Sequence, residues 1–183
     1  EEAGIHSGDS ACVIPPIVLT AENQAEMIDV ATRSALRLGV VGLMNVQFAV
    51  RAGKVYVIEI NPRASRTVPY VSKARGIPLA RLATFLCLGK RIDELGPLPS
   101  LAEAGTYYIK APVFPWGRFD MNDVLLGPEM RSTGEVMGIG RSFGEAYAKA
   151  LSAAGQGLPN EGAVFISLCD RDKHVLAELA GPL

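Results

Sequence analysis

The chain has 183 residues, which is enough to bury one hydrophobic core, or one core and part of another. Hydrophobic residues make up 49% of it and charged residues 20%, a composition that indicates a globular protein and excludes a disordered one. The formal net charge of −1 gives no electrostatic basis for binding nucleic acid or a membrane surface. No apolar stretch is long enough to span a bilayer, so we expect a cytoplasmic protein.

The cysteines indicate the same compartment. Cys12, Cys87 and Cys169 are odd in number and have neither metal-ligand nor redox spacing. We therefore expect reduced and mostly buried thiols, as in a cytosolic protein.

The first long helix has clear start and end signals. Residues 4–19 are typical of a loop with a short strand at 12–14. Thr20 is a suitable N-cap for a helix that runs through Leu38, and Gly39 is a suitable end. One face of this helix carries apolar residues at helical spacing, namely Met27, Ala31, Ala35 and Leu38.

A β-hairpin is predicted next, with strands at 43–50 and 55–61. A three-residue loop at 52–54, with a glycine inside it, is an ordinary hairpin connection. Side chains alternate between the two faces of a strand, so the polar residues of this hairpin share one face. With that loop, the cross-strand pairs are Gln47 with Glu59 and Asn45 with Asn61.

This polar face is a candidate metal site. One carboxylate together with amide oxygens is a set of hard ligands suited to Mg²⁺ or Mn²⁺, because Mg²⁺ commonly uses few protein carboxylates and completes its shell with water and phosphate. Arg63 and Arg66 follow closely and could neutralise the bound anions. The competing interpretation is a half-exposed hairpin whose polar face simply meets water.

The second half of the chain is predicted as short elements. Residues 72–88 are helical in character but interrupted at 76–78, so we expect two helices, the second burying Leu79, Leu82, Ala83, Leu86 and Cys87. After them we expect a connection at 89–105, a strand at 107–114 and an irregular stretch at 120–133. Residues 134–140 then lead into a helix over 142–153. A linker at 155–162 and an apolar strand at 163–168 precede a helical start.

Short segments of the chain resemble one enzyme family. Gln47, together with Glu-Ile-Asn-Pro-Arg at 59–63, resembles the metal-binding hairpin of the ATP-grasp fold. The resemblance narrows to the large chain of carbamoyl-phosphate synthetase through G-I-H-S-G-D-S at 4–10, N-V-Q-F-A-V at 45–50, R-A-S-R-T-V-P at 63–69 and G-P-E-M-R-S-T-G-E-V-M-G at 127–138. The first and last of these look like the second of the family's two synthetase halves, which phosphorylates carbamate.

The resemblance implies an α+β fold in three parts. Residues 1–88 would be the C-terminal portion of an ATP-grasp domain, an antiparallel sheet with helices. Residues 89–153 would complete the carbamoyl-phosphate synthetic domain, and 154–183 would be the truncated start of an α/β regulatory domain of the methylglyoxal-synthase type. The chain opens on Glu1 rather than Met, and the lobe with the phosphate-gripping lysine and arginine would precede it. We therefore expect a fragment that is inactive alone.

The implied activity is that of an ATP-grasp ligase. ATP-dependent phosphorylation of carbamate would give carbamoyl phosphate, within its synthesis from bicarbonate, ATP and the nitrogen of ammonia or glutamine, for arginine and pyrimidine biosynthesis. The implied cofactors are ATP and two Mg²⁺ or Mn²⁺ ions, with K⁺ as a further candidate. The implied partners are a glutaminase small subunit, the remainder of the large chain, and nucleotide effectors at the regulatory domain.

The resemblance also implies roles for particular residues. Gly4, Ile5, His6 and Ser7 correspond to the segment that lines the nucleotide pocket. The metal ligands would be Gln47, Glu59 and Asn61, of which Gln47 and Glu59 would also contact the nucleotide. Arg63 and Arg66 would contact carbamate and the transferring phosphoryl group, with Arg66 the more important for catalysis and Arg63 an alternative brace for the hairpin. Asp9 is left unassigned, because it could belong to a neighbouring effector or potassium site.

Segment 127–138 contains no obvious chemistry, and we expect a scaffold that joins the synthetase to the regulatory domain. In that interpretation Glu129, Arg131 and Glu135 form buried ion pairs. Some family members place a glutamate in the strand around Ala111, where it contacts the activator ornithine. Alanine cannot do so, and this departure puts ornithine activation in doubt. His174 is expected on the surface of a helix.

Two other functions remain open from the sequence. Another ATP-grasp carboxylate-amine ligase or carboxylase, such as a biotin-carboxylase relative, would share the Glu-x-Asn ending of the hairpin but not segment 127–138. A non-catalytic scaffold fragment would keep the fold without turnover.

Overall fold

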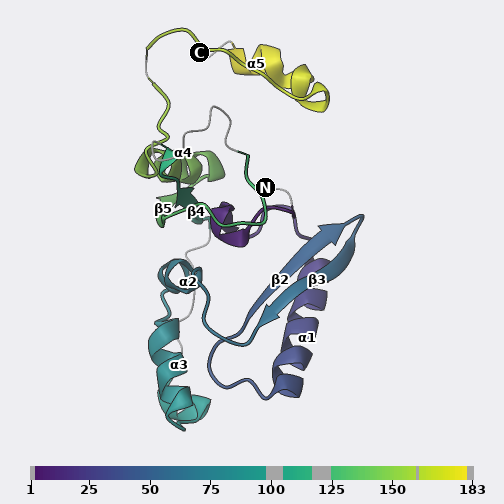
Figure 1. Cartoon of the computed structure of the whole chain (residues 1–183), viewed down its shortest axis with the longest axis vertical. Helices are drawn as coiled ribbons and strands as arrows, with labels where there is room; N and C mark the ends of the chain where they lie inside the picture. Colours follow the sequence, from purple (N-terminus) through teal and green to yellow (C-terminus); the bar gives the residue numbers. More distant parts are fainter. Residues whose placement is uncertain (1–2, 98–104, 117–124, 160, 181–183) are drawn as a thin grey trace.

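A computed structural model describes residues 3–97, 105–116, 125–159 and 161–180. In this part of the chain, two antiparallel sheets and their helices form an elongated molecule (Figure 1). The first sheet has the strand order β1 (Cys12–Ile14), β4 (Tyr107–Val113), β5 (Gly134–Gly140). The second sheet is a hairpin of β2 (Asn45–Arg51) and β3 (Lys54–Asn61). The helices are α1 (Ala21–Leu38), α2 (Val68–Arg75), α3 (Leu79–Cys87), α4 (Phe143–Ala153) and α5 (Leu176–Ala180), with 3₁₀ turns η1 (Ser7–Asp9), η2 (Ile92–Leu95) and η4 (Asp170–Val175).

Helix α1 begins and ends as the sequence predicts. The Thr20 hydroxyl accepts a hydrogen bond from Asn23 N at 3.2 Å, and Gly39 ends the helix with a φ of 61°. The helix lies alongside the hairpin in Figure 1. It is anchored there through buried Asn23, whose amide donates to Gly53 O at 2.9 Å in the hairpin loop. Leu38, part of the predicted apolar face, is 58% exposed at the last turn.

The hairpin loop is shorter than predicted. Arg51 pairs with Lys54, so the loop has two residues, Ala52 and Gly53, with φ angles of 50° and 76°. Two consecutive positive φ angles are the signature of a type I′ turn, whose twist matches that of the strands. The prediction of a three-residue loop was wrong because Ala52 adopts a left-handed backbone conformation, which residues other than glycine rarely adopt.

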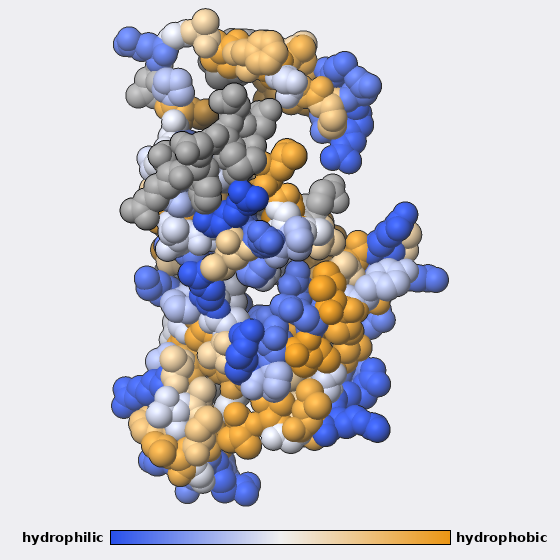
Figure 2. All heavy atoms as spheres, viewed as in Figure 1, coloured by the Kyte–Doolittle hydropathy of each residue, from blue (hydrophilic) through white to orange (hydrophobic). Residues whose placement is uncertain are grey.

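A β-bulge restores the predicted register. Phe48 pairs with Val57 and Gln47 pairs with Glu59, so Ile58 is the extra residue in β3. The pairs Gln47–Glu59 and Asn45–Asn61 are therefore confirmed, although a shorter loop and a bulge together produce them. The bulge also leaves the consecutive residues Val57 and Ile58 exposed by 47% and 46%. Figure 2 shows hydrophobic surface over this hairpin.

The core of the first sheet is built from small residues. Ile109 and Ala111 of β4 pack against Ala146 and Ala150 of α4, all of them fully buried. Gly138 of β5 lies so close to α4 that a Cβ there would collide with the carbonyl of Ala146 and would lie 2.6 Å from Ala150 N. The close approach of helix to strand therefore depends on the missing side chain of this glycine.

Helix α2 is joined to the first sheet by a buried tyrosine. The Tyr70 hydroxyl donates to Tyr108 O at 2.8 Å in β4, and burial raises the pKa of this hydroxyl. The hydroxyl therefore remains a donor at neutral pH. Helices α2 and α3 are the two short helices predicted around the interruption at 76–78.

The C-terminal segment differs from its prediction. Residues 163–168 form no strand, and Val164 and Phe165 are 62% and 92% exposed. An apolar strand needs neighbouring strands, and the part of the chain that the structure describes offers none there. Exposed His174 lies in η4, as predicted.

The cysteines are free, as expected, but Cys87 and Cys169 are exposed and Cys12 is only half-buried, so the prediction of mostly buried thiols was wrong. The connection predicted at 89–105 and the irregular stretch predicted at 120–133 lie partly outside the described residues, at 98–104 and 120–124. Within the described ranges, no helix has both the length and the apolar character needed to cross a membrane.

Substitution of Gly138 tests the packing of β5 on α4. Gly138→Ala should lower the free energy of unfolding by about 3 kcal/mol or more, because backbone atoms of α4 cannot yield to a new Cβ. Gly144→Ala is the matched control, since nothing lies within 4 Å of that position and the residue is helical. It should be neutral or stabilising by about 0.5 kcal/mol. Urea denaturation of both variants measures the difference, and equal stabilities would contradict the packing argument.

Amide hydrogen exchange tests the C-terminal segment. Amides of residues 163–168 should exchange much faster than those of paired strands such as β2 and β3, because they are not held in a ladder. Protection of this segment equal to that of the hairpin would show that it packs in solution.

Candidate functional site

An open pocket of ≈ 250 Å³ lies where η1, the hairpin, the segment after β3 and β5 meet. Its lining is almost entirely polar or charged, and consists of His6, Ser7, Gly8, Asn45, Val46, Gln47, Glu59, Asn61, Arg63, Ser65, Arg66, Thr67 and Glu135. The fold therefore gathers most of the predicted site residues in one place. Gly4 and Ile5 are not on this wall, because the chain first reaches the pocket at His6, whose backbone N–H donates to Gly127 O at 2.8 Å.

The hairpin supplies the carboxylate and amide wall. Gln47 lies directly across from Glu59, and Asn45 lies across from Asn61, so all four polar side chains come from adjacent cross-strand pairs. Amide and carboxylate oxygens in this arrangement fit Mg²⁺ or Mn²⁺. The described residues contain no cluster of three or more His, Cys, Asp or Glu that could hold a metal, so a cation here would rely on Glu59, the amides and ligands from substrate.

The two predicted arginines are held differently. Arg63 donates to Asn61 Oδ1 at 3.4 Å and to Ala64 O at 3.0 Å, and its backbone N–H donates to Asn61 O at 2.8 Å. The two bonds to Asn61 hold Arg63 against the end of β3. Arg66, in contrast, contacts the sulfur of Met130 through Nη1. Sequence reasoning missed Met130, which is 64 positions away and carries no ionisable group.

His6 is fixed in a single orientation by the turn that follows it. Its Nδ1 accepts the backbone N–H of Gly8 at 3.0 Å, and its carbonyl accepts Asp9 N at 2.9 Å. An accepting Nδ1 is unprotonated, so in this geometry Nε2 carries the proton. His6 can thus donate a hydrogen bond through Nε2.

Asp9 connects this turn to the segment before β5 through hydrogen bonds. Its carboxylate is fully buried and accepts the backbone N–H groups of Arg131 at 2.8 Å and Ser132 at 2.9 Å. The Ser132 hydroxyl donates to Gly8 O at 3.1 Å. Burial disfavours the charged form, but the hydrogen bonds from Ser132 and Arg131 outweigh it and lower the pKa of Asp9. Asp9, unassigned in sequence, thus connects two distant segments.

Glu135 is a further wall residue that sequence reasoning placed elsewhere. It was expected in a buried ion pair, and its Oε1 does lie 3.4 Å from Nζ of Lys110, whose side chain is 1% exposed. Glu135 also lines the pocket. The alternation of β5 could have revealed this, because Val136 next to it packs against the core. Exposed Glu129 does not fit the expected burial, and Arg131 is half-buried.

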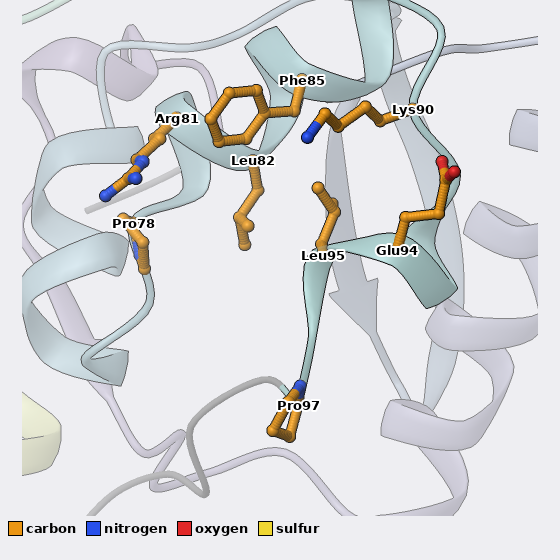
Figure 3. A pocket seen from close by; sticks show the side chains of 8 residues that line it. All are labelled: Pro78, Arg81, Leu82, Phe85, Lys90, Glu94, Leu95 and Pro97. Carbon is orange, nitrogen blue, oxygen red and sulfur yellow. The ribbon is translucent and has the colours of Figure 1, made fainter.

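A second pocket lies apart from this chemistry. It measures ≈ 430 Å³ and opens between α3 and η2, with Leu82 and Leu95 facing each other (Figure 3). Lys90 Nζ and the Arg81 guanidinium carbon lie 5.1 and 5.6 Å from the centre of the Phe85 ring. None of the predicted site residues lines it.

Comparison with known proteins identifies the family. The family model described as carbamoyl-phosphate synthase L chain, ATP binding domain, matches residues 2–95. The chain belongs to this family. The matched residues include the hairpin, both arginines and the turn with His6, and therefore most of the pocket wall.

Relatives extend the similarity to nearly the whole chain. A carbamoyl phosphate synthase large chain from Rubrobacter xylanophilus is 60% identical over 98% of this chain and 17% of its own length. A protein from Aquifex aeolicus named as the C-terminal section of that large chain is 49% identical over 98% of this chain and 36% of its own length. The chain therefore spans only a minor part of the relatives it matches.

A solved structure supports the fold. The biotin carboxylase domain of a single-chain bacterial carboxylase superposes with a TM-score of 0.50 and 22% identity, over 57% of this chain and 25% of that one. This likeness and the matched family support an α+β, ATP-grasp architecture for the part compared.

The role of Asp9 can be tested by its pH dependence. Asp9→Asn should lower the free energy of unfolding by about 1–3 kcal/mol near neutral pH, because one backbone N–H loses its acceptor. The folded-state pKa lies below the unfolded value, so the stabilisation is complete above the unfolded pKa and is lost as the pH falls through the folded one. The gap between variant and wild type, measured by urea unfolding, should therefore narrow as the pH falls below the usual pKa of an aspartate.

The control for this experiment is Asp29→Asn. Asp29 is exposed and pairs with Arg33 one helical turn away, so its removal should change stability by no more than about 0.5 kcal/mol. A cost of Asp9→Asn that stays the same from neutral to acid pH would refute the assignment of an ionised, hydrogen-bonded carboxylate.

Proposed function

We propose that this chain is part of the carbamate-phosphorylating half of a carbamoyl-phosphate synthase large chain, and that its pocket helps to transfer a phosphoryl group from ATP to carbamate. The observation that carries the proposal is the pairing of Gln47 with Glu59 at one wall of a pocket that also contains Arg63 and Arg66. The name of the Aquifex relative, a C-terminal section, supports the choice of the second half. The resemblance of segment 127–138 to the large chain of carbamoyl-phosphate synthetase supports carbamate over the carboxylase alternative.

The residues of the pocket suit a reaction that needs positioning more than acid or base catalysis. Carbamate already carries the anionic oxygen that attacks the γ-phosphorus, so no general base is required. Arg66 would stabilise the charge of the transferring phosphoryl group, and Arg63 would contact carbamate while bracing the hairpin. The turn with His6 and Ser7, preceded by Gly4 and Ile5, would bind the nucleotide through backbone amides and short polar groups.

The oxygen-rich hairpin face is where divalent cations would bind. Gln47, Glu59 and Asn61 would hold Mg²⁺ or Mn²⁺, and we propose two ions, with K⁺ as a further ligand of the enzyme. A bound divalent cation would neutralise the negative charge of the ATP phosphates. Since the hairpin offers one carboxylate, the phosphates themselves must supply much of the coordination.

Other parts of a complete synthetase are needed for turnover. We propose that the remainder of the large chain packs on the exposed apolar face of the hairpin and supplies the lobe with the phosphate-gripping lysine and arginine. The domain division at 1–88, 89–153 and 154–183, with the last part opening a regulatory domain for nucleotide effectors, belongs to this proposal. So do a glutaminase small subunit, a cytoplasmic location, and a role in arginine and pyrimidine biosynthesis.

Glu59→Gln in a complete large chain tests this assignment. The variant removes the one carboxylate of the hairpin face at nearly constant size. Formation of ATP from ADP and carbamoyl phosphate should fall about 10²–10³-fold, because charge stabilisation of phosphoryl transfer is lost. Arg66→Ala should show a similar loss, and Arg63→Ala a smaller one.

Bicarbonate-dependent ATP hydrolysis is the internal control, because we assign it to the other synthetase half. It should largely survive in all three variants. Loss of this hydrolysis with ATP synthesis intact would show that the chain belongs to the other synthetase half and that our assignment is wrong. Retention of both activities would argue for the scaffold alternative.

A further inference from the structure

Segment 127–138 is anchored against the pocket on both sides of Met130. The carbonyl of Gly127 accepts the backbone N–H of His6 at 2.8 Å, and the backbone N–H groups of Arg131 and Ser132 donate to buried Asp9. Three backbone hydrogen bonds thus bracket Met130 within a few residues. Its backbone cannot move away from the pocket without breaking at least one of them.

The side chain of Met130, a residue that is 41% exposed, lies between Gly8 of the pocket lining and Arg66. A Cβ added to Gly8 would lie 2.8 Å from Met130 Sδ and 3.2 Å from Met130 Cγ, so the absence of a side chain at Gly8 makes room for the thioether. On its other side, Met130 Sδ contacts Nη1 of Arg66. Among the described residues, the Met130 sulfur is the acceptor atom that the structure places against the Arg66 guanidinium.

A thioether differs from the usual partners of arginine. It is a weak, uncharged acceptor, so it orients a guanidinium without neutralising its charge. Arg63, three positions earlier, is bound instead to amide and carbonyl oxygens of its own hairpin. Of the two arginines, Arg66 is therefore the one whose guanidinium is oriented but can still form an ion pair with a bound anion.

We infer that Met130 is a positioning residue for Arg66: the sulfur holds the guanidinium at the edge of the pocket, directed to the oxygens of the transferring phosphoryl group. This inference rests on the proposed function. It gives segment 127–138, expected to be a scaffold, a direct part in the site.

Met130→Leu in a complete large chain tests the inference. Leucine keeps the apolar volume but offers no acceptor, so the kcat for ATP formation from ADP and carbamoyl phosphate should fall about tenfold, with a small change in the KM for carbamoyl phosphate. Met130→Gln restores an acceptor of similar reach and should recover much of the loss. Met27→Leu in α1, which does not line the pocket, is the matched control and should have no effect.

A double-mutant cycle separates positioning from packing. If Met130 acts through Arg66, Met130→Leu should cost nothing further in an Arg66→Ala background. An equal cost in both backgrounds, or full activity of Met130→Leu, would overturn the inference while leaving the proposed function intact. Full activity of Arg66→Ala would overturn the role of Arg66 and the inference together. Should Met130→Leu fail to fold, Met130→Ala, which also removes the acceptor, takes its place in the same cycle.

Discussion

The two hydrogen bonds from the backbone to Asp9 are the constraint on which the candidate site depends. They join residues 122 and 123 positions apart in the chain and hold the turn with His6 against segment 127–138. A buried carboxylate is costly without partners, and backbone amides of Arg131 and Ser132 supply them here. Without this connection, the hairpin would keep its amide and carboxylate face, but the turn with His6 would be held to segment 127–138 only by the bonds His6 N to Gly127 O and Ser132 Oγ to Gly8 O.

The charged side chains of the pocket differ in how many polar partners hold them in place. Glu135 lies beside fully buried Lys110, and Arg63 is bound to its own hairpin, so both are part of the framework. Arg66 is exposed and meets a neutral sulfur. Phosphoryl transfer requires preorganised positive charge that a substrate anion can capture. On the proposed function, Arg66 would meet the transferring phosphoryl group, while Arg63 would contact carbamate from the hairpin to which it is bound.

Small residues allow the framework to be this compact. Gly138 lets α4 lie directly on β5, and the core beneath consists mainly of alanine. Because β5 carries Glu135 on its other face, the close packing of the helix also fixes one wall of the pocket. Fold stability and site geometry are thus linked through the same strand.

The sequence by itself determined what depends on neighbours along the chain. The cap at Thr20, the stop at Gly39 and the shared polar face of the hairpin follow from local hydrogen bonding and from alternation, whereas the two-residue loop and the bulge that set its pairs were not predicted. Only the tertiary structure decided what depends on distant backbone: the partners of Asp9, the contact of Met130 with Arg66, and the place of Glu135 in the pocket. The exposed segment 163–168 shows the same limit, because an apolar strand forms only where other strands are there to pair with it.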